Sequence, residues 1–138
     1  MTPTNKIVAD LLVAGGIGAL SGTADWAVHV GQEPKKPDNC ITILEFSVRP
    51  PQNVSDRANY KPVRYPGVQI RIRGHVYATV VAKLELCNEI LRVKRATVTD
   101  GVRYMGYNQT TDLISMGRDD SDRAIVVTSW ECVIRETS

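Results

Sequence analysis

Apolar and polar residues alternate along the stretch YPGVQIRIRG, residues 65–74. A period of two is typical of a β-strand whose two faces have different surroundings. The apolar positions are Val68, Ile70 and Ile72, and the polar positions are Gln69, Arg71 and Arg73. The pattern therefore predicts one face that packs on a core. The other face is either simply solvated, as in many antiparallel sheets, or binds something.

Two segments have helical spacing instead. The first begins at a cap, Thr4 or Asn5, and runs to about residue 14, where the glycines of GGIG end it. The second runs over about 76–93, with apolar residues three and four positions apart. Its predicted inner face is Tyr77, Val80, Val81, Leu84, Cys87 and Leu91, and its predicted outer face is Lys83, Glu85, Asn88 and Glu89.

Further strands are predicted from β-branched and aromatic runs bounded by turn residues. They cover 26–30, 41–48, 95–99, 102–107, 113–118 and 124–135. Pro50 and Pro51 are expected to end the second of these, since proline cannot donate to a β-ladder. Residues 52–64 then form a long exposed loop. The order of elements predicts an α+β fold, a mostly antiparallel β-sheet packed against two α-helices, in a single domain over residues 1–138.

Composition narrows the function only by exclusion. The chain has 138 residues, 43% of them hydrophobic, and a formal net charge of +2, without the basic surplus of a dedicated nucleic-acid-binding protein. Its aromatic residues are scarce and do not alternate with basic ones. The first apolar run is interrupted by Asp10, which favours an amphipathic helix over a secretion signal or membrane span. Three widely spaced cysteines, Cys40, Cys87 and Cys132, are expected to be reduced and buried.

No pattern of residues predicts catalysis. His29 and His75 lie far apart in the sequence and have no metal-ligand spacing. GGIG follows a helix and lacks the lysine of a phosphate-binding loop. The acidic residues Asp119, Asp120 and Asp122 lack the glycine and distal glutamate of a calcium loop, so a solvated turn is the simpler interpretation. We therefore expect no enzyme activity, no cofactor and no metal; a small enzyme or ligand-binding domain remains the rival from another class.

The order of features from residue 41 onward resembles the tail terminator and minor capsid (tail completion) proteins of long-tailed bacteriophages. A strand ending in RPPQN is followed by a loop and by YKPVRYPGVQIRIRG, which leads into a long helix. The residues that match the family pattern are Pro66, Val68, Gln69, Ile70, Ile72, Arg73 and Tyr77. A glycine and acidic turn before the last strand, in SMGRDDSDRAIVVTSWECVI, is a further match. The resemblance covers about residues 41–134.

The resemblance implies a structural virion protein of the tail and neck, assembled in the host cytoplasm and independent of membranes. Such a protein looks like a subunit of a homohexameric ring that caps the tail tube, ends its polymerisation and provides the joint to the head-side connector. The implied partners are further copies of the chain, the tail tube protein, the connector or stopper protein, and double-stranded DNA that passes through the lumen without sequence-specific binding. The alternative is a head completion or stopper protein of the same neck.

Three groups of residues are candidates for the ring interface. The first is the polar face of the strand at 65–74, with Gln69, Arg71 and Arg73, because arginine forks pair well with carboxylates. The second is the loop at 52–64, with Arg57, Tyr60 and Arg64, and the third is the turn at 117–123, with Arg118, Asp119, Asp120 and Asp122. For each group, an ordinary solvated surface is the competing interpretation.

Overall fold

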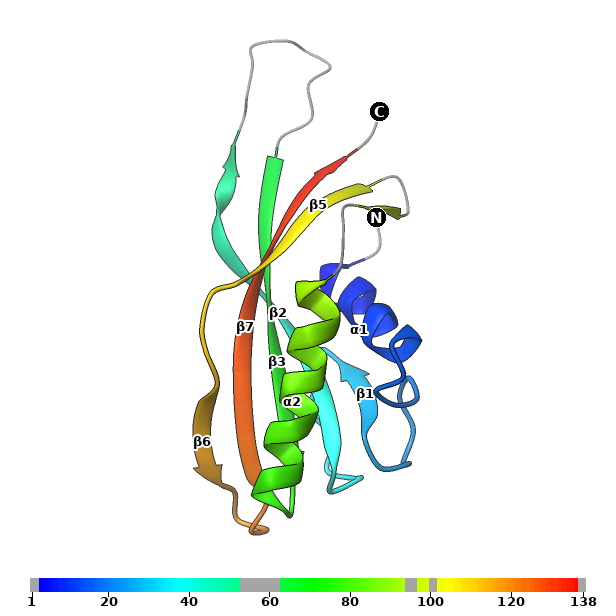
Figure 1. The fold of residues 1–138 in the computed structure, drawn as a ribbon, viewed down its shortest axis with the longest axis vertical. Helices are drawn as coiled ribbons and strands as arrows, with labels where there is room; N and C mark the ends of the chain where they lie inside the picture. The colour runs from blue at the N-terminus through cyan, green and yellow to red at the C-terminus, as the bar shows by residue number, and fades with distance from the viewer. Residues whose placement is uncertain (1–2, 53–62, 94–96, 100–101, 137–138) are drawn as a thin grey trace.

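The fold is known from a computed structural model, which describes residues 3–52, 63–93, 97–99 and 102–136. Figure 1 shows two helices lying on the same side of one long, twisted sheet. The elements in chain order are α1 (Thr4–Ala14), β1 (Ala27–Val30), β2 (Cys40–Gln52), β3 (Val63–Gly74), α2 (Tyr77–Arg92), β4 (Thr97–Thr99), β5 (Val102–Gln109), β6 (Ile114–Arg118) and β7 (Ala124–Glu136). The predicted α+β class is confirmed.

The seven strands form one sheet in the order β1-β2-β3-β7-β5-β4, with β6 paired to the lower part of β7. Only β1 and β2 are parallel; the other named pairs are antiparallel. The long strands β2, β3 and β7 extend well past the upper ends of the helices (Figure 1). The sheet therefore has a lower part covered on one face by helices and an upper part that projects beyond them.

The predicted core face of β3 is confirmed, because Val68, Ile70 and Ile72 have no exposed surface. The register of β3 with β7 places them beside Trp130, Thr128 and Val126 in turn, all buried on the helix side. The helix α1 packs on β1, β2 and β3, and α2 packs on β3, β5 and β7. All three cysteines are free and buried, as expected.

The prediction that the two prolines end β2 is wrong, because the strand continues to Gln52. The pairing with β3 shifts register between Ser47 and Arg49 and again between Arg49 and Gln52. Beyond the short β1, which pairs only with residues 40–43, no described strand lies on the outer side of β2. Proline is tolerated at such an edge, because its missing N–H removes no ladder bond.

The expected cap of α1 is also wrong. The N-cap residue is Pro3, with no side-chain hydrogen bond, and Thr4 and Asn5 are buried within the first turn. In α2, the sequence pattern misplaces two residues: Tyr77 is 45% exposed, whereas Asn88 is buried. The core positions Val80, Leu84, Cys87 and Leu91 are as predicted, and so is the glycine at the end of α1.

Candidate assembly interface

The polar face of β3 binds a segment of its own chain. Arg71 Nε donates to Glu33 Oε2 at 2.6 Å, and Arg73 Nη1 donates to Glu33 Oε1 at 3.2 Å. Arg73 also donates to the carbonyl oxygens of Pro37 at 2.8 Å, Asp38 at 3.3 Å and Lys35 at 3.4 Å. The arginine is only 2% exposed. Its guanidinium fork therefore holds the connection between β1 and β2 against the face of the sheet that no helix covers.

Asp38 joins this segment to two other parts of the chain. Its carboxylate accepts hydrogen bonds from Lys36 Nζ at 3.1 Å and Arg123 Nη1 at 3.2 Å, and it contacts His75 Nε2 at 3.0 Å. The hydrogen bond with His75, followed by that with Lys36, lowers the pKa of Asp38 to about 2. The end of β3, the start of β7 and the β1–β2 connection are thus linked at the lower end of the sheet.

The turn at 117–123 is closed by its own side chains. Asp119 Oδ1 accepts the backbone N–H groups of Ser121 and Arg123, both at 3.0 Å, and Asp119 Oδ2 accepts Arg123 Nε at 2.8 Å. Partial desolvation opposes ionisation, but these hydrogen bonds hold the pKa of Asp119 below its usual value. Asp120 and Asp122 remain exposed at the surface of the turn.

The predicted interface residues fall into separate places. Arg71, Arg73 and the 117–123 turn meet at the lower end of the sheet through Glu33, Asp38 and Arg123, whereas Arg64 is exposed on the projecting part of β3. Gln69 is half-buried on the face away from the helices. Arg57 and Tyr60 lie outside the described residues. The structure thus gives Arg73 a role inside the subunit, and the contribution of the other residues to a ring contact stays a prediction.

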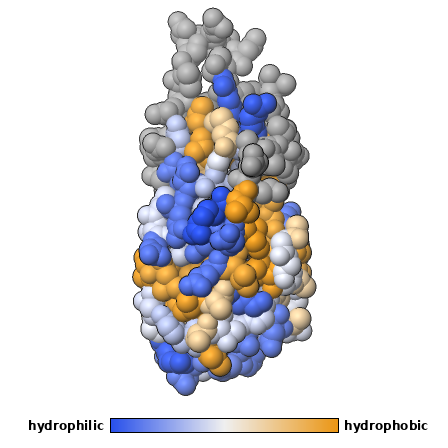
Figure 2. All heavy atoms as spheres, in the orientation of Figure 1, coloured by the Kyte–Doolittle hydropathy of each residue, from blue (hydrophilic) through white to orange (hydrophobic). Residues whose placement is uncertain are grey.

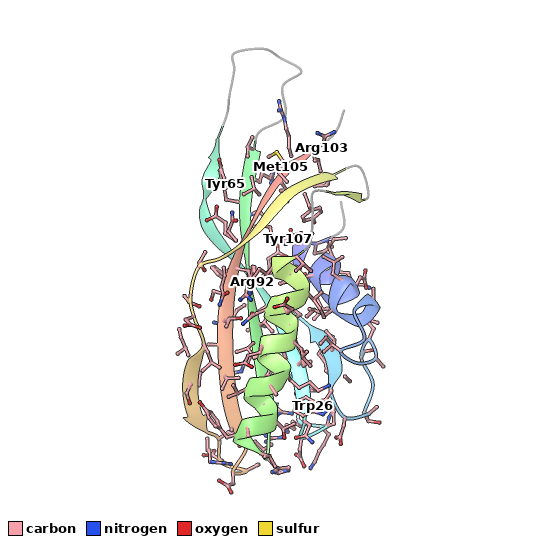
Figure 3. All side chains as sticks on the ribbon, in the orientation of Figure 1. Trp26, Tyr65, Arg92, Arg103, Met105 and Tyr107 are labelled. Carbon is pink, nitrogen blue, oxygen red and sulfur yellow. The ribbon has the colours of Figure 1, made fainter. Side chains whose placement is uncertain are left out.

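Exposed apolar side chains lie on both faces of the molecule. On the helix side, Leu86 of α2 and Val93, which follows the last residue of α2, are 53% and 65% exposed, and Figure 2 shows hydrophobic surface gathered across this face. On the projecting part of the sheet, Phe46 and Met105 are about two-fifths exposed. Figure 3 shows Met105 on this projecting part, which also carries Tyr65 of β3 and Arg103 of β5. Phe46 and Met105 lie on β2 and β5, which are separated by β3 and β7, so they are single exposed apolar residues and not one patch.

The sequence was compared with models of known protein families. Residues 10–136 match the family described as "Bacteriophage tail terminator protein". The chain belongs to the bacteriophage tail terminator family. The resemblance drawn from the sequence motifs is thereby confirmed, and the chain is a structural component of a phage tail.

The fold is similar to that of one chain in a solved virion structure. A chain of the structure titled "Virion of native gene transfer agent (GTA) particle" superposes with a TM-score of 0.56 at 11% sequence identity, over 94% of this chain and 84% of the other. At this identity the likeness concerns the fold alone. A comparison with curated protein sequences finds no match.

Two of the buried cysteines of this tail terminator family member are protonated at neutral pH. Burial raises the pKa of the Cys87 and Cys132 thiols to about 12, so neither is a thiolate at neutral pH. Within the described ranges, no three His, Cys, Asp or Glu side chains are placed to hold a metal ion. No helix in the described part of the chain is long and apolar enough to cross a membrane.

Sequence reasoning missed Glu33, Asp38 and Arg123, which complete the network around Arg73 in this tail terminator family member. Glu33 and Asp38 lie in the turn-rich stretch GQEPKKPDN, which reads as an ordinary polar connection. The sequence offered one signal: the carboxylates of Glu33 and Asp38 could pair with the two arginines of β3. Nothing in the sequence shows that a segment almost 40 residues away returns to that face.

Proposed function

We propose that this protein forms a homohexameric ring that caps the phage tail tube, ends its polymerisation and provides the joint to the head-side connector. The observation that carries the proposal is the match to the tail terminator family over residues 10–136. The fold also supports the proposal, because the superposition on one chain of a virion structure covers 94% of this chain.

A six-membered ring needs a heterologous interface, in which one patch of a subunit meets a different patch of its neighbour. A stable contact of this kind buries at least about 1,000 Å² in total. The exposed apolar residues at α2 and those on the projecting sheet lie on different parts of the surface, which supports such a contact. We include the predicted polar residues Gln69, Arg71 and Arg64 in it, together with Arg118, Asp119, Asp120 and Asp122 of the turn.

The lumen of the ring would conduct double-stranded DNA without binding it by sequence. DNA carries about one negative charge per 1.7 Å of helix axis, so a strongly basic lumen would retain it. The formal net charge of +2 is compatible with passage. The remaining partners in the proposal are the tail tube protein on one side of the ring and the connector or stopper protein on the other, with assembly in the host cytoplasm.

The test is the mass of the purified protein alone and with preassembled tail tubes, by light scattering, combined with negative-stain imaging. Six-fold rings at one end of the tubes, and tubes that no longer elongate, are the expected result. A protein that stays monomeric, leaves the tubes uncapped and binds the portal side instead would refute the terminator function in favour of a stopper.

A further inference from the structure

An acidic depression of about 680 Å³ lies between α2 and the segment that follows β5. Its wall carries three carboxylates, Glu85, Glu89 and Asp112, against one guanidinium, Arg92. Figure 3 shows Arg92 at the upper end of α2, on the side of the sheet that carries the helices. The depression is distant from the network around Arg73 at the lower end of the sheet, and nothing in that network uses it.

The negative charge of the depression is only partly compensated. Arg92 Nη1 donates to Glu89 at 3.3 Å, and Arg92 Nη2 donates to Gln109 Oε1 at 3.4 Å. Asp112 accepts the backbone N–H of the next residue at 2.7 Å, which leaves its charge in place. No residue in the described part of the chain pairs with Glu85. A cationic group could therefore bind without displacing an existing ion pair.

The floor of the depression offers a hydrogen-bond donor. Asn88 is 6% exposed and lines the depression, and its Oδ1 accepts both Thr128 Oγ1 and Trp130 Nε1 at 3.0 Å. The indole N–H can only donate, so it fixes which end of the amide points inward. The Nδ2 group is thus the part left to face the depression, and no described residue accepts from it. A peptide carbonyl that enters the depression can accept a hydrogen bond from this group.

Together, carboxylates on the wall and a donor at the floor suit a peptide segment with basic side chains. The chain itself contains such a segment between β2 and β3. Residues 53–62 have the sequence NVSDRANYKP, with Arg57 and Lys61 against Asp56, and Arg64 follows at the start of β3. Its charge is opposite to that of the depression, which favours encounter and fixes register between two proteins.

The segment cannot easily serve its own subunit. Val63, at the start of β3, pairs with Arg135 on β7. Gln109, at the depression, pairs with Trp130 on the same strand, five residues before Arg135. At about 3.3 Å per residue, this separation is roughly 17 Å. The strands β2 and β3 continue away from the helices (Figure 1), so their described ends, Gln52 and Val63, lie at the far end of the sheet.

We propose that the acidic depression of one subunit binds the basic segment 53–64 of a neighbouring copy, which comprises the β2–β3 connection and the first two residues of β3. The proposal rests on the ring assembly proposed above and names one of its contacts. The Asn88 amide donates to a backbone carbonyl of the incoming segment, and Glu85, Glu89 and Asp112 pair with its basic side chains.

A charge exchange tests this contact. Glu85→Lys combined with Glu89→Lys reverses the depression, and Arg57→Glu combined with Lys61→Glu reverses the segment. Each pair of substitutions alone should weaken ring formation by about tenfold or more, since like charges then face each other, and the two pairs together should restore most of it. Asp25→Lys, at an exposed position outside the depression, is the matched control and should leave ring formation unchanged.

Circular dichroism of each variant confirms folding, and Glu85→Gln with Glu89→Gln repeats the test without introducing positive charge. Reversals that leave ring formation unchanged would overturn the contact while the ring function stands, and so would a combined variant that is no better than the single reversals. If the unaltered protein forms no rings even with tubes, the proposed function fails. In that case, fluorescence anisotropy of a synthetic peptide of residues 53–64 tests the contact separately. Peptide binding that is weakened by Glu85→Lys with Glu89→Lys supports the contact. A peptide that does not bind the unaltered protein refutes it.

Discussion

Arg73→Met should destabilise the folded subunit severely. The substitution keeps a long side chain but removes the hydrogen bonds that Arg73 donates to Glu33 and to the carbonyl oxygens of Pro37, Asp38 and Lys35. The arginine is almost fully buried, so water does not replace these bonds without rearrangement of the β1–β2 connection. The Glu33 carboxylate would keep Arg71 as its one described partner.

The magnitude follows from the geometry. Two of the four contacts, at 2.8 and 3.2 Å, are short enough to count as full hydrogen bonds with a charged donor. At about 1.5–3 kcal/mol each, they give a loss of about 3–6 kcal/mol, which overlaps the range of about 3–5 kcal/mol for removing one partner of a buried ion pair. For a chain of this length, that loss corresponds to a fall in Tm of roughly 10–20 °C.

Thermal and urea unfolding of the subunit, followed by circular dichroism, measure the loss. Arg71→Met is the matched control, because Arg71 is more exposed and makes one bond to Glu33; its loss should be about 1–2 kcal/mol. Arg73→Lys should not recover the wild-type stability, since an ammonium group lacks the planar fork that serves several acceptors. A loss below about 1 kcal/mol for Arg73→Met would show that Arg73 acts as an ordinary surface cation, and the reasoning would be wrong.

Three further predictions concern other contacts. Asn88→Ala should cost about 2–4 kcal/mol in urea unfolding, because it leaves two buried donors without their acceptor; a loss below 1 kcal/mol would contradict this. Gly18→Ala should cost about 1–3 kcal/mol, because the added methyl overlaps the carbonyl oxygen of Trp26, whereas Gly106→Ala, with open space, should cost far less; equal losses would refute the overlap. Asp38 has a lowered pKa, so its contribution is present above about pH 4 and is lost as the pH falls through about 2; the stability difference between wild type and Asp38→Asn should shrink across that window, and a constant difference would refute the linkage.

Local patterns predicted the elements well because each one is encoded by neighbouring residues. The alternation in β3 and the three- and four-residue spacing in α2 both survive in the structure, since burial of one face is what each pattern reports. The prolines of β2 misled the prediction because their effect depends on whether the strand has a neighbour on that side. The burial of Asn88 depends similarly on Trp130, which lies 42 residues away. Such outcomes are set by tertiary pairing and have no local signature.

The candidate site was harder to predict than the fold, because the residues that form it are distant in the chain. The sequence raised the question of what the polar face of β3 binds, and Arg73 turns out to bind its own β1–β2 connection. The Arg73 network and the acidic depression are therefore expected to affect different properties, subunit stability and assembly. Loss of Arg73 should lower the stability of the subunit whether or not a neighbour is present, because all its described acceptors belong to the same chain. Reversal of Glu85 and Glu89, which are exposed on α2, should instead leave the isolated subunit folded and lower only its assembly. A concentration series separates the two, since only the assembly defect is relieved by raising the protein concentration.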